Sequence, residues 1–180
     1  MKQARNACKS NPATVRVCWD LDNTLAGSGM LLRSGIPLRA AIVDAEPVPN
    51  MPAFYDALHA RLPEAHHFIL SARTPSMRRD TVAWLDRHGL EADDAGICFV
   101  PNVDAKLEVW RQLARDARLV IVDDLSHDHE ADEPSVYEHL VRVAEQIAFI
   151  YIGLDRIAEI TRSTAAAEAV ASEVIEALAT

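Results

Sequence analysis

Two short stretches rich in aspartate each follow an apolar run of the chain. The first reads D-L-D-N-T at residues 20–24, and the second begins with the pair Asp123-Asp124. In an extended segment, residues two apart point the same way, so Asp20 and Asp22 can face one ligand. One carboxylate can attack phosphorus to form an aspartyl phosphate, and the other, when protonated, can donate to the leaving oxygen. These residue types therefore predict phosphoester chemistry.

Phosphoester chemistry on a carboxylate also needs cations, because an anionic phosphate repels an anionic nucleophile. Lys106 is the candidate point charge, and Arg111 and Arg115 are rival cations close by in the chain. The hydroxyl groups of Thr24 and Ser71 can donate to phosphoryl oxygens. The chain thus offers both positive charge and hydrogen-bond donors for a phosphate.

A divalent cation is expected with these carboxylates. Mg²⁺ prefers oxygen ligands in near-octahedral geometry. Asp20 and Asp124 can supply carboxylate oxygens, and Asp22 can supply its backbone carbonyl. We therefore expect Mg²⁺ as the cofactor, although Mn²⁺ and Co²⁺ bind the same kinds of ligand.

Short apolar runs that alternate with longer amphipathic segments must position these residues. This alternation is typical of an α/β protein with a parallel sheet, and continuous apolarity is typical of strands covered on both faces. Ligands bind at the carboxyl ends of such strands, which is where the candidate residues follow the runs. The predicted strands are Val15–Trp19, His67–Leu70, Ile97–Val100, Leu119–Val122 and Ala148–Ile152.

The expected fold is a Rossmann-like three-layer α/β/α sandwich with a central parallel sheet, formed by one domain over residues 1–180. One of the helices, from Pro75, has Thr74 as the expected N-cap and ends at Gly89. The last helix can break near residues 161–164, where helix propensity falls. The predicted helices are Met51–Leu62, Pro75–His88, Asp104–Arg115, Pro134–Gln146 and about Asp155–Ala179.

Residues 26–50 contain too many glycines and prolines for one continuous helix. Met30–Leu32 and Leu38–Val43, separated by a turn at residues 34–37, are interpreted as the strands of a small β-hairpin flap. The flap would cover about residues 26–48, which leaves no room for a large cap domain.

The candidate residues resemble, in chain order, the four motifs of the haloacid dehalogenase (HAD) superfamily. D-L-D-N-T at residues 20–24 resembles the first motif, and Ser71 the second. Lys106 resembles the third and the pair at 123–124 the fourth. The likeness covers residues 15 to about 128.

The resemblance implies a role for each matching residue. Asp20 would be the nucleophile and Asp22 the general acid and base. Asp20, Asp22 and Asp124 would hold the metal, Asp123 would act on it through a water, and Asp128 would orient the lysine or a metal-bound water. The residues implied to bind the substrate phosphate are Thr24, Ser71, Ala72, Arg73 and Lys106.

An aspartate two residues after the nucleophile separates the phosphatase branches of the superfamily from dehalogenases and ion pumps. Asp22 therefore implies a Mg²⁺-dependent phosphomonoester hydrolase, an enzyme of the HAD phosphatase type. Two alternatives remain: a phosphoryl- or acyl-transfer enzyme of secondary metabolism, since some such members carry a similar D-L-D-N-T, and a non-catalytic binding module. A pure binder has no need for both Asp20 and Asp22.

A site without a large cap is open, which suits a phosphorylated polymer end as well as a phosphorylated small molecule. Ser71-Ala72-Arg73 and the aspartate pair also resemble the 3′-phosphatase domain of polynucleotide kinases. The net charge of −9 does not favour nucleic acid as the partner. An open site and the Ala-rich C-terminal helix are compatible with a homodimer.

Composition indicates a globular protein outside the membrane. The chain has 49% hydrophobic and 25% charged residues and no apolar stretch long enough to span a bilayer. Its three cysteines are widely spaced, which favours reduced thiols and a cytoplasmic location. The pair His66-His67 is expected at a strand entry, and residues 127–130 are expected in a solvated loop rather than at a transition-metal site.

Overall fold

The computed structural model describes residues 14–90, 96–127 and 135–180. Within them, five parallel strands form one sheet in the order β3-β2-β1-β4-β7. The central strand is β1, and its last three residues, 17–19, are buried. All the predicted strands are confirmed. Their bounds are β1 Thr14–Trp19, β2 His66–Ser71, β3 Ile97–Phe99, β4 Ala117–Val122 and β7 Ile150–Ile152.

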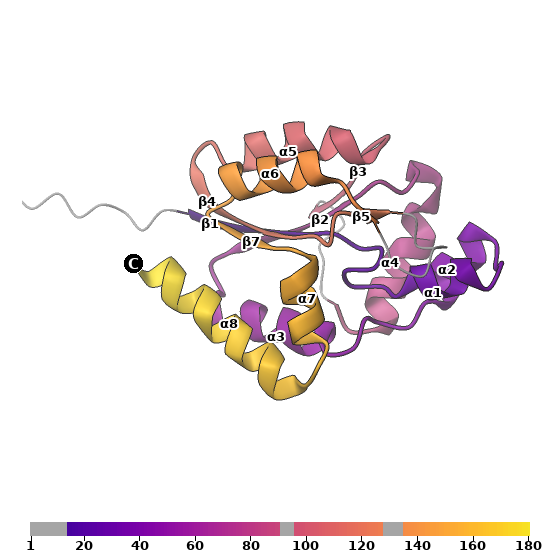
Figure 1. Ribbon diagram of the computed structural model, residues 1–180, viewed down its shortest axis with the longest axis horizontal. Coiled ribbons are helices and arrows are strands. Elements are labelled where there is room, and N and C mark those ends of the chain that lie inside the picture. The colour runs from indigo at the N-terminus through magenta and orange to yellow at the C-terminus, as the bar shows by residue number, and fades with distance from the viewer. Residues whose placement is uncertain (1–13, 91–95, 128–134) are drawn as a thin grey trace, which may run out of the picture.

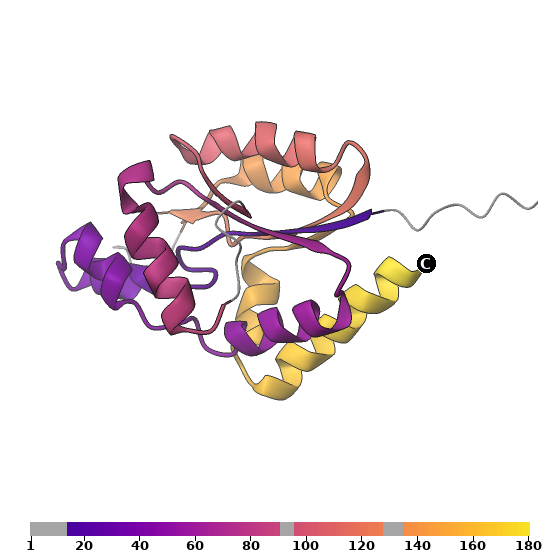
Figure 2. The ribbon, with the colours of Figure 1, turned by 180° about the vertical axis from the view of Figure 1, so that it is seen from behind.

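Helices cover both faces of the sheet, which confirms the predicted three-layer α/β/α sandwich (Figure 1). One face carries α5 (Lys106–Leu113) and α6 (Glu138–Ile147), and the other carries α3 (Met51–Arg61), α7 (Leu154–Ile160) and α8 (Thr164–Ala179). Consecutive residues of β1 point to opposite faces, so Cys18 packs with Trp110 and Trp19 packs with Phe54. Seen from behind, α3 and α8 lie side by side under the sheet (Figure 2).

The helix ends follow local signals. A 3-10 turn at Pro75–Met77 leads into α4 (Arg78–Arg87), and Gly89 follows that helix with a positive φ of 68°. Thr74 is the N-cap residue of that turn, as expected, but its side chain makes no capping bond, and its hydroxyl bonds that of Ser76 at 2.8 Å instead. The C-terminal segment is two helices, as the low propensity suggested, and Ser163 caps the second by accepting from the Ala166 amide.

The flap is helical, so the β-hairpin predicted for residues 26–48 is wrong. The segment forms α1 (Ser28–Arg33) and α2 (Leu38–Asp44), joined by a turn in which Gly35 has a φ of 74°. An isolated antiparallel bridge between Ala26 and Pro47 closes its base. Leucine, alanine and arginine favour a helix, and α2 packs a face that includes Ala41 against the rest of the protein.

Beyond the carboxyl ends of the sheet strands lie α1, α2 and α4 (Figure 1). The Trp84 indole of α4 donates to the Ala45 carbonyl at the end of α2 at 2.7 Å, which anchors the flap. A short antiparallel ribbon, β5 (Ser126–His127) with β6 (Ser135–Val136), also lies at this end and was not predicted. Among the described residues, no helix is long and apolar enough to cross a membrane.

Candidate active site

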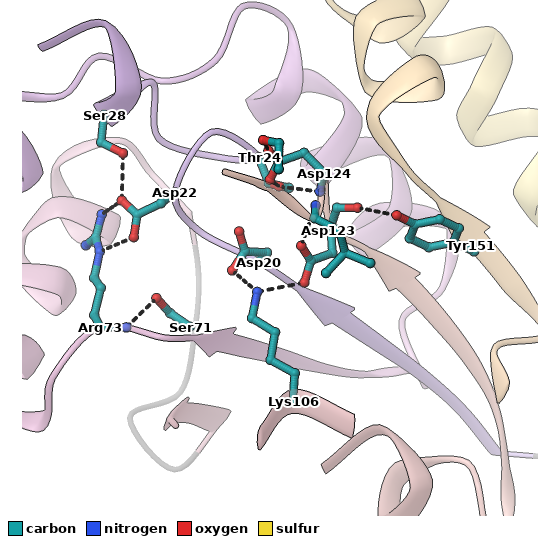
Figure 3. A network of polar contacts seen from close by, with 12 residues as sticks. Asp20, Asp22, Thr24, Ser28, Ser71, Arg73, Lys106, Asp123, Asp124 and Tyr151 are labelled. Atoms are coloured by element: carbon teal, nitrogen blue, oxygen red, sulfur yellow. Dashed lines mark hydrogen bonds and ion pairs between the residues drawn. The ribbon is translucent and has the colours of Figure 1, made fainter. Parts of the chain in front are cut away.

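The candidate residues meet at the carboxyl ends of β1, β2 and β4 (Figure 3). Trp19 pairs with Val122 in the parallel register, so the residues that follow these two strands emerge next to each other. The Asp20 amide then donates to the Val122 carbonyl at 2.8 Å, which extends the ladder by one bond. Asp20 and Asp123 are thereby placed side by side, as the sequence predicted from the strand ends.

Lys106 joins these two aspartates. Its Nζ donates to Asp20 Oδ1 at 2.6 Å and to Asp123 Oδ2 at 2.7 Å. The residue begins α5 and is only 3% exposed. Burial by itself would lower the pKa of Lys106, but the charges of Asp123 and Asp20 outweigh it and raise that pKa. The ammonium group therefore stays charged beside the candidate nucleophile.

Asp20 itself is buried among other carboxylates. Burial, followed by the charge of Asp123, raises the pKa of Asp20 to about 7, and Lys106 opposes both effects. With a pKa of about 7, Asp20 is partly protonated at neutral pH, and a further cation bound beside it would favour the ionised carboxylate. The site therefore favours binding of further positive charge next to Asp20.

Asp124 lies on the other side of this group, at the end of β4. Its Oδ1 accepts from the Thr24 hydroxyl at 2.9 Å, and its amide donates back to the Thr24 oxygen at 3.1 Å. The Ser126 hydroxyl donates to the second carboxylate oxygen. Burial and the charges of Asp20 and Asp123 raise the pKa of Asp124 well above its ordinary value.

The donor set fits a hard divalent cation. Asp20, Asp123 and Asp124 each offer an oxygen atom, and these atoms lie within 4.8 Å of one another. Like charges this close are unfavourable unless cations compensate them, and oxygen is the ligand that Mg²⁺ prefers. The family resemblance implied that Asp123 acts on the metal only through a water. In the structure its carboxylate joins the cluster, where Lys106 and the Leu125 amide bond it.

Asp22 has different partners from Asp20. Arg73 donates to it twice, from Nε to Oδ2 at 2.8 Å and from Nη2 to Oδ1 at 2.7 Å. The Ser28 hydroxyl donates to Oδ1 at 2.7 Å. Burial by itself would raise the pKa of Asp22, but the hydrogen bonds and charge of Arg73, with the bond from Ser28, lower it. Asp22 is therefore a carboxylate at neutral pH.

The remaining predicted phosphate contacts lie at the end of β2. The Ser71 hydroxyl is buried and accepts from the Arg73 amide at 3.2 Å, and Ala72 between them is exposed. In this bond the hydroxyl oxygen is the acceptor, so its proton remains for another oxygen. Asp128, expected to orient the lysine or a water, lies outside the described residues.

Two turns with unusual backbone geometry direct the aspartates. Asn23 has a φ of 63° and Leu125 a φ of 48°, the left-handed region that side chains rarely adopt. Asn23 accepts from the Gly29 amide at 2.8 Å, and the Leu125 amide donates to Asp123 Oδ1 at 3.0 Å. Such strain persists only where surrounding contacts hold it. An asparagine after the second aspartate is compatible with such a turn, whereas no sequence signal marks Leu125.

Several residues at the site were not predicted. Ser28 and Ser126 bond the aspartates, as described above, and the Tyr151 hydroxyl donates to the Asp123 carbonyl at 3.0 Å. Gly153 gives the tyrosine ring its space, since a Cβ there would lie 2.8 Å from it. Hydroxyl side chains are too common for sequence alone to single these out.

No protein-family model matches the chain, and no curated protein matches it significantly.

Proposed function

We propose that the protein is a Mg²⁺-dependent phosphomonoester hydrolase of the HAD type, in which Asp20 carries the phosphoryl group. The arrangement of Lys106 supports this most directly, because one buried ammonium bonds both Asp20 and Asp123 beside Asp124. A carboxylate nucleophile can approach a phosphate only where fixed cations offset their repulsion. Lys106 supplies one such cation at the nucleophile.

Asp20, Asp124 and the backbone carbonyl of Asp22 are proposed to hold Mg²⁺, following the family resemblance. The bound ion would supply positive charge that stabilises the phosphoryl group as negative charge develops on it. The buried carboxylates are suited to this, since burial and the charges of neighbouring aspartates raise the pKa values of Asp20 and Asp124, and Lys106 only partly offsets these effects.

The proposed reaction has two steps. An Asp20 oxygen attacks phosphorus and forms a bond to it, the bond from phosphorus to the substrate oxygen breaks, and a proton from Asp22 converts that oxygen to an alcohol. A water then gives its proton to Asp22 and attacks phosphorus, the bond to Asp20 breaks, and inorganic phosphate leaves. The Ser71 hydroxyl and Lys106 would hold phosphoryl oxygens in both steps.

The ionised state of Asp22 suits the base of the second step directly. The first step requires a proton on Asp22 when the leaving alcohol is poor, and the proton that Asp22 took from water in the preceding turnover supplies it. A stable leaving anion such as p-nitrophenolate requires this proton less. Asp22→Asn should therefore accumulate the aspartyl phosphate, because water would lack its base.

The test is hydrolysis of p-nitrophenyl phosphate with Mg²⁺ and with a chelator, by wild type and Asp20→Asn. We expect Mg²⁺-dependent release of inorganic phosphate that falls at least about a thousandfold in Asp20→Asn. Asp86→Asn is the matched control, because Asp86 is exposed on α4 and takes no part in the site. A folded Asp20→Asn protein with wild-type turnover would contradict the nucleophile assignment.

The products separate hydrolysis from transfer. Release of one inorganic phosphate for each alcohol supports the hydrolase. Phosphate found instead on an added alcohol acceptor would favour a phosphoryl-transfer enzyme that uses the same aspartate.

A further inference from the structure

Asp22 is held from two directions by residues outside the predicted catalytic set. The Ser28 hydroxyl donates to Oδ1 from the start of α1 (Figure 3). Arg73 donates to both oxygens, and Arg73 is in turn bonded by Thr81, whose hydroxyl accepts from Nη1 at 3.1 Å. The carboxylate is thus connected to the flap on one side and to α4 on the other.

The donors of Arg73 are directed inward. Nε and Nη2 reach Asp22 and Nη1 reaches Thr81, and the side chain is 2% exposed whereas that of Asp22 is 32% exposed. An arriving substrate would therefore meet Asp22 before it met the guanidinium group. This arrangement favours Arg73 as a support for Asp22 over the substrate contact expected from the sequence.

Thr81 and Ser28 are buried with their hydroxyl groups engaged in this network. Thr81 is fully buried in α4 and Ser28 is 1% exposed. A buried hydroxyl is unfavourable without a partner, so each contact constrains both groups that make it. The flap is also fixed at its base, where the Gly27 amide donates to the Glu46 carbonyl at 2.9 Å.

We propose that Ser28 and Thr81 are positioning residues for the acid–base step, Ser28 by its bond to Asp22 and Thr81 through Arg73. This proposal rests on the proposed function, in which Asp22 exchanges protons with the leaving oxygen and with water. A proton can be transferred only across hydrogen-bond distance, so small displacements of the carboxylate reduce the rate strongly. The flap and α4 thereby control the position of Asp22.

The experiment compares phenyl phosphate with p-nitrophenyl phosphate, which have nearly the same shape. Phenolate is the poorer leaving group and depends more on a proton from Asp22. We expect kcat/KM for phenyl phosphate to fall about tenfold in Ser28→Ala and in Thr81→Val, and kcat/KM for p-nitrophenyl phosphate to change less than about twofold. Ser28→Thr and Thr81→Ser, which keep the hydroxyl group, should restore the phenyl phosphate value.

Ser76→Ala is the control, because it removes an exposed hydroxyl near the same end of α4 that bonds only Thr74 in the described structure. It should leave both substrates unchanged. An equal fall with both substrates in Ser28→Ala and Thr81→Val would indicate a merely structural role and would overturn the proposal, as would no fall with either.

Crystal structures of the same variants separate this proposal from the proposed function. If wild type hydrolyses neither substrate, the proposed function fails, but the positioning is still tested by the place of the Asp22 carboxylate. A carboxylate that turns away from Arg73 in either variant supports the positioning role. A carboxylate that stays in place in both variants overturns it.

Discussion

The two aspartates of D-L-D-N-T lie two residues apart and have opposite environments. Asp20 is 8% exposed in its side chain and shares a buried lysine with Asp123, whereas Asp22 is 32% exposed and pairs with Arg73. The pKa of Asp20 is raised to about 7 and that of Asp22 is lowered. Two neighbouring carboxyl groups therefore acquire different protonation behaviour from their surroundings alone.

The difference follows from the elements that support each group. The Asp20 region is built on strand ends and the start of α5, where the central sheet fixes the backbone. Asp22 also follows β1, but its partners come from the end of β2 (Arg73) and from the start of α1 (Ser28), and Thr81 of α4 bonds Arg73 from behind. The flap and α4 lie beyond the carboxyl ends of the sheet strands (Figure 1). The cluster of Asp20, Lys106 and Asp123 is thus held by strand ends and α5, whereas the Asp22 carboxylate is bonded by Arg73 after β2 and by Ser28 of the flap.

The largest expected effect is on the Asp20 region, from Lys106→Met. This change removes the ammonium group and keeps a side chain of similar length, leaving three buried carboxylates uncompensated. We expect the metal-free protein to lose about 3 kcal/mol of unfolding free energy and all measurable phosphatase activity. Urea unfolding with and without Mg²⁺ measures this, and Mg²⁺ should recover part of the loss.

Arg111→Met provides the comparison for that change, since Arg111 is an exposed cation on the same helix. Its stability should stay within about 0.5 kcal/mol of wild type. If Lys106→Met were as stable as Arg111→Met, the buried carboxylates would not need the charge of Lys106 for the stability of the folded protein.

An intermediate effect separates the two aspartates by the sign of a stability change. Asp20 has a folded-state pKa above its unfolded value, so its contribution is present at low pH and is lost as pH rises through about 7. The pKa of Asp22 is lower in the folded state than in the unfolded state. Its contribution to stability is therefore present above the unfolded-state pKa and is lost as pH falls through the folded-state pKa. Metal-free Asp20→Asn should therefore melt about 3 °C higher than wild type at pH 8, and Asp22→Asn about 3 °C lower.

Differential scanning calorimetry in the presence of a chelator measures both variants. Repeating the scans at pH 5 should shrink the gain of Asp20→Asn, because wild-type Asp20 is then largely protonated. Shifts of the same sign at pH 8 would show that the two carboxylates do not differ in the way their contacts imply.

The smallest expected effect concerns the support behind Asp20. The Trp19 indole donates to His67 Nδ1 at 3.1 Å, and the centroids of the His67 and His59 rings lie 3.6 Å apart. Burial, with His59 and His66 nearby, lowers the pKa of His67 to about 3. A histidine kept neutral in the folded state destabilises the protein as pH falls from about 6.5 toward that value, because the unfolded chain takes up the proton first.

We expect His67→Asn to flatten the decline in stability between pH 6 and pH 4, since its side-chain oxygen can accept from Trp19 without titrating. Urea midpoints over that range measure the decline. His139→Gln is the control, because His139 is exposed on α6. Equal slopes for wild type and His67→Asn would assign the acid sensitivity to other groups.

The helical flap shows where local patterns were insufficient. Gly35 and Pro49 lie in turns, as expected, but Gly29 lies inside α1, and the short apolar segments of this region fit a strand or a helix equally well. In the folded protein, α2 packs beside α4, and the Trp84 indole donates to the Ala45 carbonyl at the end of α2. These contacts form with the segment in its helical conformation. Such contacts join residues far apart in the chain, so the helix and strand propensities of the segment itself cannot predict them.

By itself, the sequence determined the strands, the helices on the two faces, and the meeting of Asp20, Lys106 and Asp124 at one edge. Apolar runs and the residues directly after them are local features, and parallel strands bring their carboxyl ends together in any sheet of this kind. Tertiary structure alone decided the partner of Asp22, because Arg73 is 51 residues away in the chain and reaches it only when β1 and β2 pair. The protonation of each aspartate depends on burial and on neighbouring charges, which exist only in the folded chain.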